Sequence, residues 1–302
     1  MHEHGSAPAA WLPAALVLGG ALLLLACGYL WAASAGRRRG RSWSAWRTAA
    51  LVAGVFLAMV ALGPLGAAGH RDFVAHMWGH LLLGMAAPLL LVVSAPVTVL
   101  LRGLPAHRAR SLSRLLQSTW LRIVSHPAVA AALNVGGLWL LYTTALHGWM
   151  HTSWLGHLVV HGHVLLAGLV FTAAILQVDP TPHGHGHRLR AACLVGFLAL
   201  HAILGKHLSA HPPVGVDEAS GQAGAQLMYD GGDYIDVVLI ALFCLDWYRR
   251  TAPRRAAPSP HRGLSARPEA SGSVVERCGG GAAQHAQAHH EGGDAIGQHR
   301  GE

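Results

Sequence analysis

The sequence has few charged residues. Asp, Glu, Lys and Arg make up 12% of its 302 positions, roughly half of what a soluble protein carries. Because 52% of the residues are apolar, the chain cannot build a water-soluble surface, and a soluble enzyme is excluded. Cysteine is scarce too. Cys27, Cys193, Cys244 and Cys278 are far apart and form no Cys-x-x-Cys motif, which argues against a disulfide framework and against a thiolate zinc site.

The sequence contains several long apolar runs. A hydrocarbon core roughly 30 Å thick is crossed by about 20 apolar residues in a helix, and such runs recur along the first 250 positions. They predict seven membrane-spanning helices, at residues 11–33, 46–65, 77–101, 128–146, 158–177, 189–208 and 234–248. We therefore predict an all-α polytopic membrane protein, with a seven-helix transmembrane domain at 1–250 and a disordered cytoplasmic tail at 251–302.

Basic residues gather on one side of these predicted spans. They are Arg37, Arg38, Arg39, Arg41 and Arg47 after the first span, Arg102, Arg108, Arg110, Arg114 and Arg122 after the third, Arg188 and Arg190 before the sixth, and Arg249, Arg250, Arg254 and Arg255 after the seventh. Because cytoplasmic loops retain Lys and Arg, this pattern predicts an outside N-terminus and an inside C-terminus. Since the clusters flank helices, we expect the lipid bilayer, and not nucleic acid, as a partner despite a net charge of +8.

Two segments depart from straight spans. Pro88 and Pro96 lie within the predicted span 77–101, and because proline removes a backbone donor we expect that span to be kinked or locally unwound there. Residues 106–122 place leucines and Trp120 on one helical face and arginines on the other. This amphipathic pattern predicts a short helix on the cytoplasmic membrane surface.

Histidine is unusually frequent, with 23 residues, and much of it falls in His-x-x-x-His pairs. Two histidines one helical turn apart lie on the same face, about 6 Å from each other, and can hold one ion together. A single interfacial histidine more often serves packing, but the predicted topology puts four pairs at outer helix ends. The predicted metal ligands are His76, His80, His147, His151, His157, His161 and His207. His211, the fourth partner, precedes two prolines that end its helix.

Copper is the metal that this pattern favours. Imidazole suits copper, zinc, iron and nickel, whereas methionine selects copper(I), and four methionines fall on the same outer side: Met77, Met85, Met150 and Met228. Two acidic residues near the last span also have expected roles. Asp236 is expected to support a ligand histidine through a hydrogen bond, and Asp246 to pair with Arg249 or Arg250 one turn away.

Other histidines are given no ligand role. His163 points about 200° away from His161 on the predicted helix and is expected to be structural. His201 lies deeper in its span. The His183-x-His185-x-His187 loop falls on the cytoplasmic side and is read as a flexible polar loop in preference to a metal site.

The stretch HMWGHLLLGMAAPLLLVVSAPVTVLLRGLP at 76–105 resembles the signature of the CtaG-type, multi-spanning cytochrome c oxidase assembly factors. The segments LWLLYTTALHGWMH, WLGHLVVHGHVLLAGLVFTAAILQVDP and DGGDYIDVVLIALFCLDWYRR are similar to the same family, and the resemblance extends over about residues 11–250. It implies a multi-pass protein of the bacterial plasma membrane that helps copper reach the buried copper centre of a haem-copper oxidase from the outer side. His76 and His80 match the family motif best.

These observations together predict a carrier and not an enzyme. The protein is expected to bind copper transiently at outward helix ends and to pass it to a subunit of the haem-copper oxidase. Two alternatives stay open. One is a seven-span zinc-dependent membrane lipid hydrolase, which needs an outer Asp and Ser and has Ser153 and Ser209 as the nearby serines. The other is a membrane cytochrome that holds haem between histidines of facing helices.

Overall fold

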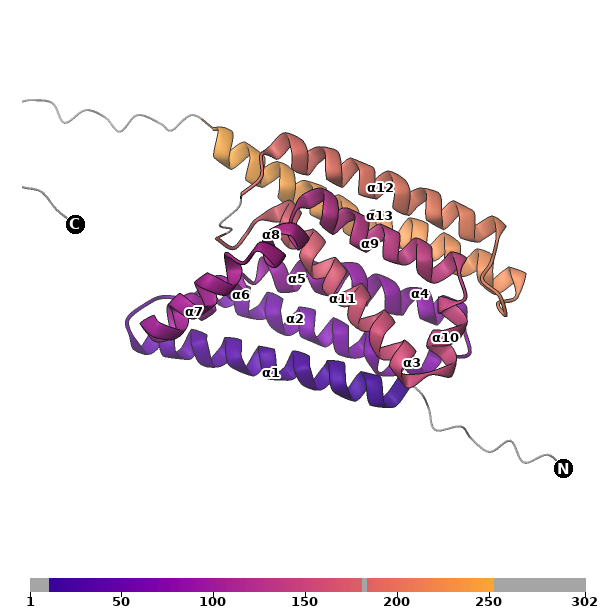
Figure 1. Ribbon diagram of the computed structural model, residues 1–302, viewed down its shortest axis with the longest axis horizontal. Helices are drawn as coiled ribbons and strands as arrows, with labels where there is room; N and C mark the ends of the chain where they lie inside the picture. The colour runs from indigo at the N-terminus through magenta and orange to yellow at the C-terminus, as the bar shows by residue number, and fades with distance from the viewer. Residues whose placement is uncertain (1–10, 181–183, 253–302) are drawn as a thin grey trace, which may run out of the picture. The chain divides into compact units, whose positions relative to one another are not determined.

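The computed structural model describes residues 11–180 and 184–252, and these are helical with short connections (Figure 1). The elements are α1 (Trp11–Arg38), α2 (Ala45–Leu62), α3 (Pro64–Ala68), α4 (Phe73–Leu81), the π-helical turn η1 (Leu82–Ala86), α5 (Ala87–Val93), α6 (Pro96–Gly103), α7 (Ala106–Leu116), α8 (Thr119–Val124), α9 (Pro127–Thr143), α10 (Leu146–Thr152), α11 (Trp154–Leu176), α12 (His187–Ala210) and α13 (Glu218–Thr251). No strand occurs among these described residues, which confirms the all-α prediction. Apart from Thr251 and Ala252, the predicted tail 251–302 lies outside them.

Five helical stretches of the described chain are long and apolar enough to cross a membrane. They are Trp11–Arg38, Ala45–Ala68, Phe73–Val93, Trp154–Leu176 and His187–Ala210. A sixth arises if α9 and α10 count as one span, although these two helices meet at a bend of 78°. The predicted seventh run lies within α13, whose first half carries Glu218, Asp230 and Asp233. The structure thus supports a multi-pass membrane protein with five or six candidate spans, and the count of seven stays a prediction.

The third predicted span is broken at both of its prolines. Pro88 has no N–H to offer the carbonyl of Gly84, and its ring crowds that carbonyl; the chain responds with η1, where the Ala87 N–H reaches Leu82 O, five residues back. Ala95 adopts the left-handed conformation at φ 55°, and Pro96 starts α6 directly after it. The expected kink and unwinding are confirmed. The predicted boundary at residue 101 is wrong, because α5 already ends at Val93.

A carboxylate from a distant loop secures the start of α6. Asp179, which follows α11, accepts hydrogen bonds from the backbone N–H groups of Val97 and Thr98 at 3.2 and 2.7 Å, and from the Thr98 hydroxyl at 2.6 Å. These donors belong to the first turn of α6, where no intrahelical acceptor exists. Asp179 therefore caps α6 and ties it to the end of α11.

We expect Asp179→Ala to lower the free energy of unfolding by about 1–2 kcal/mol, since replacing a helix cap costs about that much. The measurement is denaturant-induced unfolding of the purified protein in detergent. Asp233→Ala is the control, because Asp233 is exposed on α13. Equal unfolding midpoints for the two variants would contradict the capping role.

Buried charge links α12 and α13 near the opposite end from the predicted ligand histidines. Arg190 is 1% exposed and donates to Ile175 O at 2.6 Å and to the Asp246 carboxylate at 3.2 Å. Arg250 donates to the same carboxylate at 2.7 Å from one turn away. The expected pairing of Asp246 with an arginine of the last turn is confirmed for Arg250, and the sequence pattern did not indicate Arg190.

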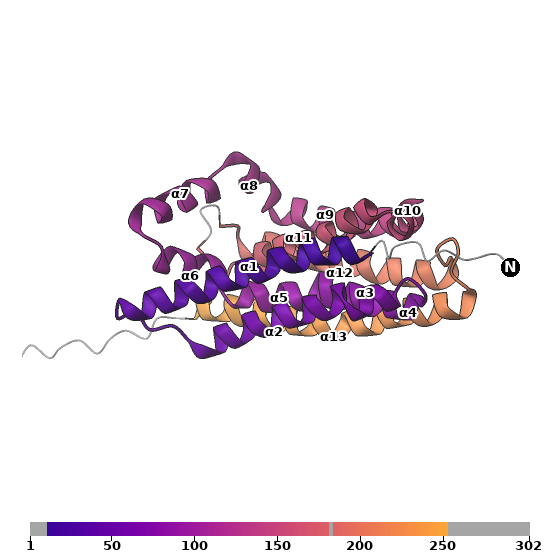
Figure 2. The ribbon, with the colours of Figure 1, turned by 90° about the horizontal axis from the view of Figure 1, so that it is seen from below.

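Elements that carry predicted ligand histidines come together at one end of the bundle. Figure 1 shows α3, α10 and the start of α4 at the end opposite to α6, α7 and α8. Seen from below, α7 and α8 stand away from α2 and α13 (Figure 2). The predicted amphipathic helix 106–122 is thus two helices separated near Gln117 and Ser118, with Leu115 and Trp120 exposed. Its place on a membrane surface stays a prediction.

Candidate metal centre

Eight histidine side chains, which we call the histidine cluster, form a connected set of ring contacts in which Tyr142 links His80 and His201 to the other six. Its members are His70, His76, His80, His147, His151, His157, His161 and His201. Spacing of one helical turn supplies the pairs on α10 and α11, and the packing of α11 against both α10 and η1 joins those pairs to α4. Six of the seven histidines predicted as ligands are brought together in this cluster.

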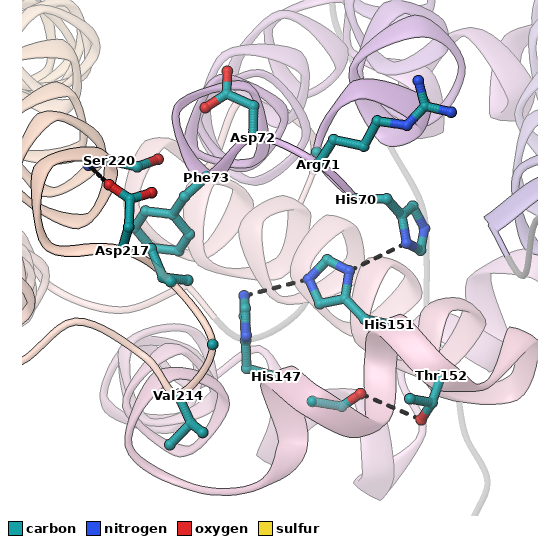
Figure 3. A pocket seen from close by; sticks show the side chains of 14 residues that line it. His70, Arg71, Asp72, Phe73, His147, His151, Thr152, Val214, Asp217 and Ser220 are labelled. Atoms are coloured by element: carbon teal, nitrogen blue, oxygen red, sulfur yellow. Dashed lines mark hydrogen bonds between the residues drawn. The ribbon is translucent and has the colours of Figure 1, made fainter.

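Three rings stand at the outer edge of the histidine cluster, with His151 between His70 and His147 (Figure 3). The Nδ1 atoms of His151 and His70 are 3.2 Å apart, and the Nε2 atoms of His151 and His147 are 3.4 Å apart. Imidazole nitrogens bind zinc-like ions at about 2.0–2.1 Å, so two nitrogens on one tetrahedral ion lie about 3.3 Å apart. Each pair therefore already has the separation of two ligands of one ion.

These rings line a cavity of about 340 Å³, which we call the mouth cavity (Figure 3). Its wall also includes Asp72 and Asp217, and each of these carboxylates caps a helix: Asp72 accepts from the first turn of α4 and Asp217 from Ser220 N at 2.9 Å. Burial lowers the pKa of His70 below its ordinary value of 6.5, since a partly desolvated imidazole disfavours its charged form. At neutral pH His70 is consequently a neutral ring with a lone pair available for a metal.

Deeper in the bundle, three histidines converge on a second space, the central cavity. His76 and His80 reach it from α4 and His161 from α11, and Tyr142 completes its polar lining. Its volume is about 20 Å³, enough for one ion or one water molecule. The sequence pattern predicts each pair separately, whereas the structure brings members of two pairs to the lining of one cavity.

Hydrogen bonds orient the rings of His161 and His76. The Nδ1 atom of His161 lies 3.1 Å from the carbonyl of His157, and because a carbonyl only accepts, Nδ1 carries the proton and Nε2 the lone pair. The Tyr142 hydroxyl donates to Met77 Sδ and lies 3.1 Å from His76 Nε2. His76 Nε2 can bond to that hydroxyl in either tautomer, so this contact orients the His76 ring whichever nitrogen carries its proton. Such bonds orient ligand histidines in metal sites.

Several buried nitrogens of the histidine cluster have no hydrogen-bond partner among the described residues. They are both ring nitrogens of His80 and of His157, and Nε2 of His70 and of His201. Buried polar atoms are nearly always hydrogen-bonded, so this concentration calls for an ion or water as partner. Within the described ranges no three His, Cys, Asp or Glu side chains are already spaced as a complete metal site. The cluster thus offers ligands mainly in pairs.

One predicted ligand lies apart from the histidine cluster. His207 stacks on His211 with ring centroids 4.8 Å apart and lies 5.5 Å from the Trp139 ring. The one-turn spacing therefore brings this pair together as predicted, but the structure does not join it to the other pairs.

The histidines that were given no ligand role have other neighbours. His163 Nε2 donates to the Leu133 carbonyl at 3.0 Å, which agrees with the expected structural role. His183 lies outside the described residues, and the ring of His185 is 4.7 Å from that of His126. The expected hydrogen bond from Asp236 to a ligand histidine is not seen for Oδ1, which has no partner in the described part of the chain.

Sequence reasoning missed two members of the histidine cluster. His70 belongs to the loop before α4 and has no histidine four residues away, so the His-x-x-x-His pattern does not predict it as a ligand. The usable signal is Gly69: a Cβ there would lie 3.1 Å from the Cα of His76, so the missing side chain lets this loop approach α4. His201 is a single residue of α12, and its ring lies 6.1 Å from that of His80 because α13 packs against both α12 and α4.

The serines proposed for a hydrolase are used otherwise. The Ser153 hydroxyl accepts from Gly156 N at 3.3 Å and caps α11, and Ser209 is exposed on α12. The serine that lines the mouth cavity is Ser220, which the sequence-based interpretation leaves out.

Comparison with known proteins gives one family and three relatives. A family model described as cytochrome c oxidase caa3 assembly factor matches residues 27–250. The chain is 33% identical to the uncharacterized proteins Mb0105 of Mycobacterium bovis and MT0111 of Mycobacterium tuberculosis, over 63% of this chain and 30% of each relative. It is also 33% identical to ML1998 of Mycobacterium leprae, over 45% of this chain and 22% of that protein. The chain therefore spans less than a third of these relatives' length. No solved structure matches it.

Proposed function

The chain belongs to the family of cytochrome c oxidase caa3 assembly factors, and from that membership we propose that it binds copper in the histidine cluster and passes it to a subunit of the haem-copper oxidase. The observation that carries the proposal is the central cavity, where His76, His80 and His161 meet around a space of about 20 Å³. Lone pairs on buried, neutral imidazoles are the ligands that copper accepts.

Neighbouring sulfur favours copper over zinc. Met77, Met150 and Met228 are buried in one apolar cluster with Tyr142, and the Tyr142 hydroxyl bonds to both His76 and Met77. Thioether sulfur is a ligand for copper(I) and a poor one for zinc. We infer that the imidazoles bind the ion and that these methionines stand close enough to take part when it moves.

The arrangement of ligands in pairs suits transfer. A closed four-ligand cage holds its metal permanently, whereas an ion held by two nitrogens can exchange one ligand at a time. Copper would enter at His70 and His151 in the mouth cavity and move to His76, His80 and His161. This is the work of a carrier, in keeping with an assembly factor. We place the mouth cavity on the outer side of the bacterial plasma membrane, with seven spans, the N-terminus outside and the C-terminus inside.

We expect His161→Gln to weaken copper(I) binding at least about tenfold, since removing a group that only orients a ligand already costs that much, and to lower the copper content of the oxidase in a host that carries only this variant. His163→Gln is the matched control, because His163 lies two residues away on α11 and bonds to a backbone carbonyl. The measurement is copper per oxidase after growth in copper-limited medium. Equal copper contents of the oxidase for the two variants would contradict the proposed role of the central cavity.

A further inference from the structure

Beyond the histidine cluster, four helical elements each contribute one polar or sulfur side chain to a small space, the inner cavity. Met85 comes from η1, Asn134 from α9, Thr172 from α11 and Asp236 from α13, and all four are buried. Its volume is about 20 Å³, room for one small ion or one water. The rest of its lining is apolar or glycine: Gly84, Leu89, Phe171, Phe197, Ile235 and Leu239.

Asp236 is the unusual member of this lining. It is 5% exposed, and its Oδ1 has no hydrogen-bond partner among residues 11–180 and 184–252. The side chains that line the inner cavity include no Lys or Arg to neutralise a carboxylate. An unpaired acid inside a membrane bundle is costly and marks a binding or transport role by default. Its ionised form needs a cation in the inner cavity.

The inner cavity adjoins the histidine cluster through His201. A Cβ at Gly232 would lie 3.0 Å from His201 Cε1, so the imidazole rests against α13 one turn before Asp236. The same ring stacks on Phe197, which lines the inner cavity, with centroids 5.7 Å apart. On its other side the ring is 6.1 Å from that of His80. Contacts therefore run from the central cavity, through His201, to the inner cavity.

We infer that the inner cavity is a second binding site for copper(I), in which Asp236 neutralises the ion and Met85 supplies a soft ligand. This inference rests on the proposed function. A single positive charge beside one carboxylate forms a neutral pair, which a low-dielectric interior tolerates, whereas a divalent ion leaves excess charge there. Thioether sulfur adds the preference for copper(I), and Asn134 and Thr172 offer oxygen atoms to complete the surroundings.

The test is anaerobic titration of the full chain in detergent with copper(I), read as equivalents bound per chain. Asp236→Asn keeps the shape of the side chain and is expected to bind one equivalent fewer than the wild-type protein. Asp230→Asn, exposed on the same helix, is expected to bind as many as the wild type. Met85→Leu preserves side-chain size; X-ray absorption at the copper edge is expected to lose a sulfur contribution in it, and this reads out the site independently if Asp236→Asn does not fold.

The possible outcomes distinguish failure of the inner site from failure of the proposed function. Wild-type and Asp236→Asn proteins that bind equal numbers of copper ions would overturn the inner site and leave the histidine cluster standing. An unchanged sulfur contribution in Met85→Leu would overturn it as well. A wild-type protein that binds no copper(I) would overturn the inner site and the proposed function together.

Discussion

Replacing both His76 and His80 with Asn is expected to weaken copper(I) binding at least about 100-fold and to leave the host oxidase without most of its copper. Removing a group that only orients a metal ligand costs about 10–100-fold in affinity, so removing two ligands costs at least the upper value. His76 also lies 5.4 Å from His147, and His80 lies 6.1 Å from His201, as ring centroids. The double variant therefore removes the two rings that lie between the mouth cavity and the inner cavity.

A second His-x-x-x-His pair provides the matched control. His207 and His211 stack on each other but lie apart from the histidine cluster, so replacing both with Asn removes the same chemistry from elsewhere. We expect copper affinity and oxidase activity close to those of the wild type for this control. Equal losses in both double variants would mean that histidine content alone, and not the central cavity, governs copper binding.

Gly168→Val is expected to destabilise the bundle by about 3 kcal/mol or more, the upper end of the range for overpacking a core. A Cβ on Gly168 would collide with the Gly84 carbonyl and lie 2.9 Å from Pro88 Cγ. The carbonyl is backbone and cannot turn aside, so α11 and η1 would have to separate. Because α11 carries His161 and η1 continues from α4, which carries His80, copper binding is expected to fall with stability.

The control for this variant is Gly196→Val. Gly196 is exposed on α12, and a Cβ there would meet nothing within 4 Å. Both variants place the same branched side chain in a helix, so propensity costs are matched. Melting of the two proteins in detergent, followed by circular dichroism, gives the comparison. If the Gly168→Val protein melts at the same temperature as the Gly196→Val protein, the close approach of Gly168 to Gly84 does not contribute to stability.

The histidine pairs show what sequence can predict about this site. Spacing of four residues indicates which rings share a helix face, and the structure places His157 and His161 with centroids 3.9 Å apart. Spacing does not indicate which pairs meet, since that depends on how helices pack. His207 looks like the others in sequence, yet it lies against Trp139. Conversely, His70 has no partner in its own loop and acquires one from α10.

For the helices too, the sequence predicts some features and not others. Apolar length and the prolines predict the all-helical fold and the break near Pro88, because both effects are local. The 78° bend between α9 and α10 is not indicated by apolar length, although Thr144 marks its position: the Thr144 hydroxyl accepts from Leu146 N at 3.3 Å at the start of α10. The bend shapes the candidate metal centre, because α10 carries His147 and His151, which line the mouth cavity. Tertiary packing, which a local pattern does not encode, sets this angle.

Copper(I) affinity of the purified full chain is the decisive measurement for copper binding in the histidine cluster. The protein in detergent competes anaerobically with a coloured copper(I) chelator at neutral pH, and a parallel sample is titrated with zinc. We expect at least one copper(I) bound per chain, in preference to zinc. A chain that leaves all copper(I) with the chelator, or that binds zinc in preference, would contradict it.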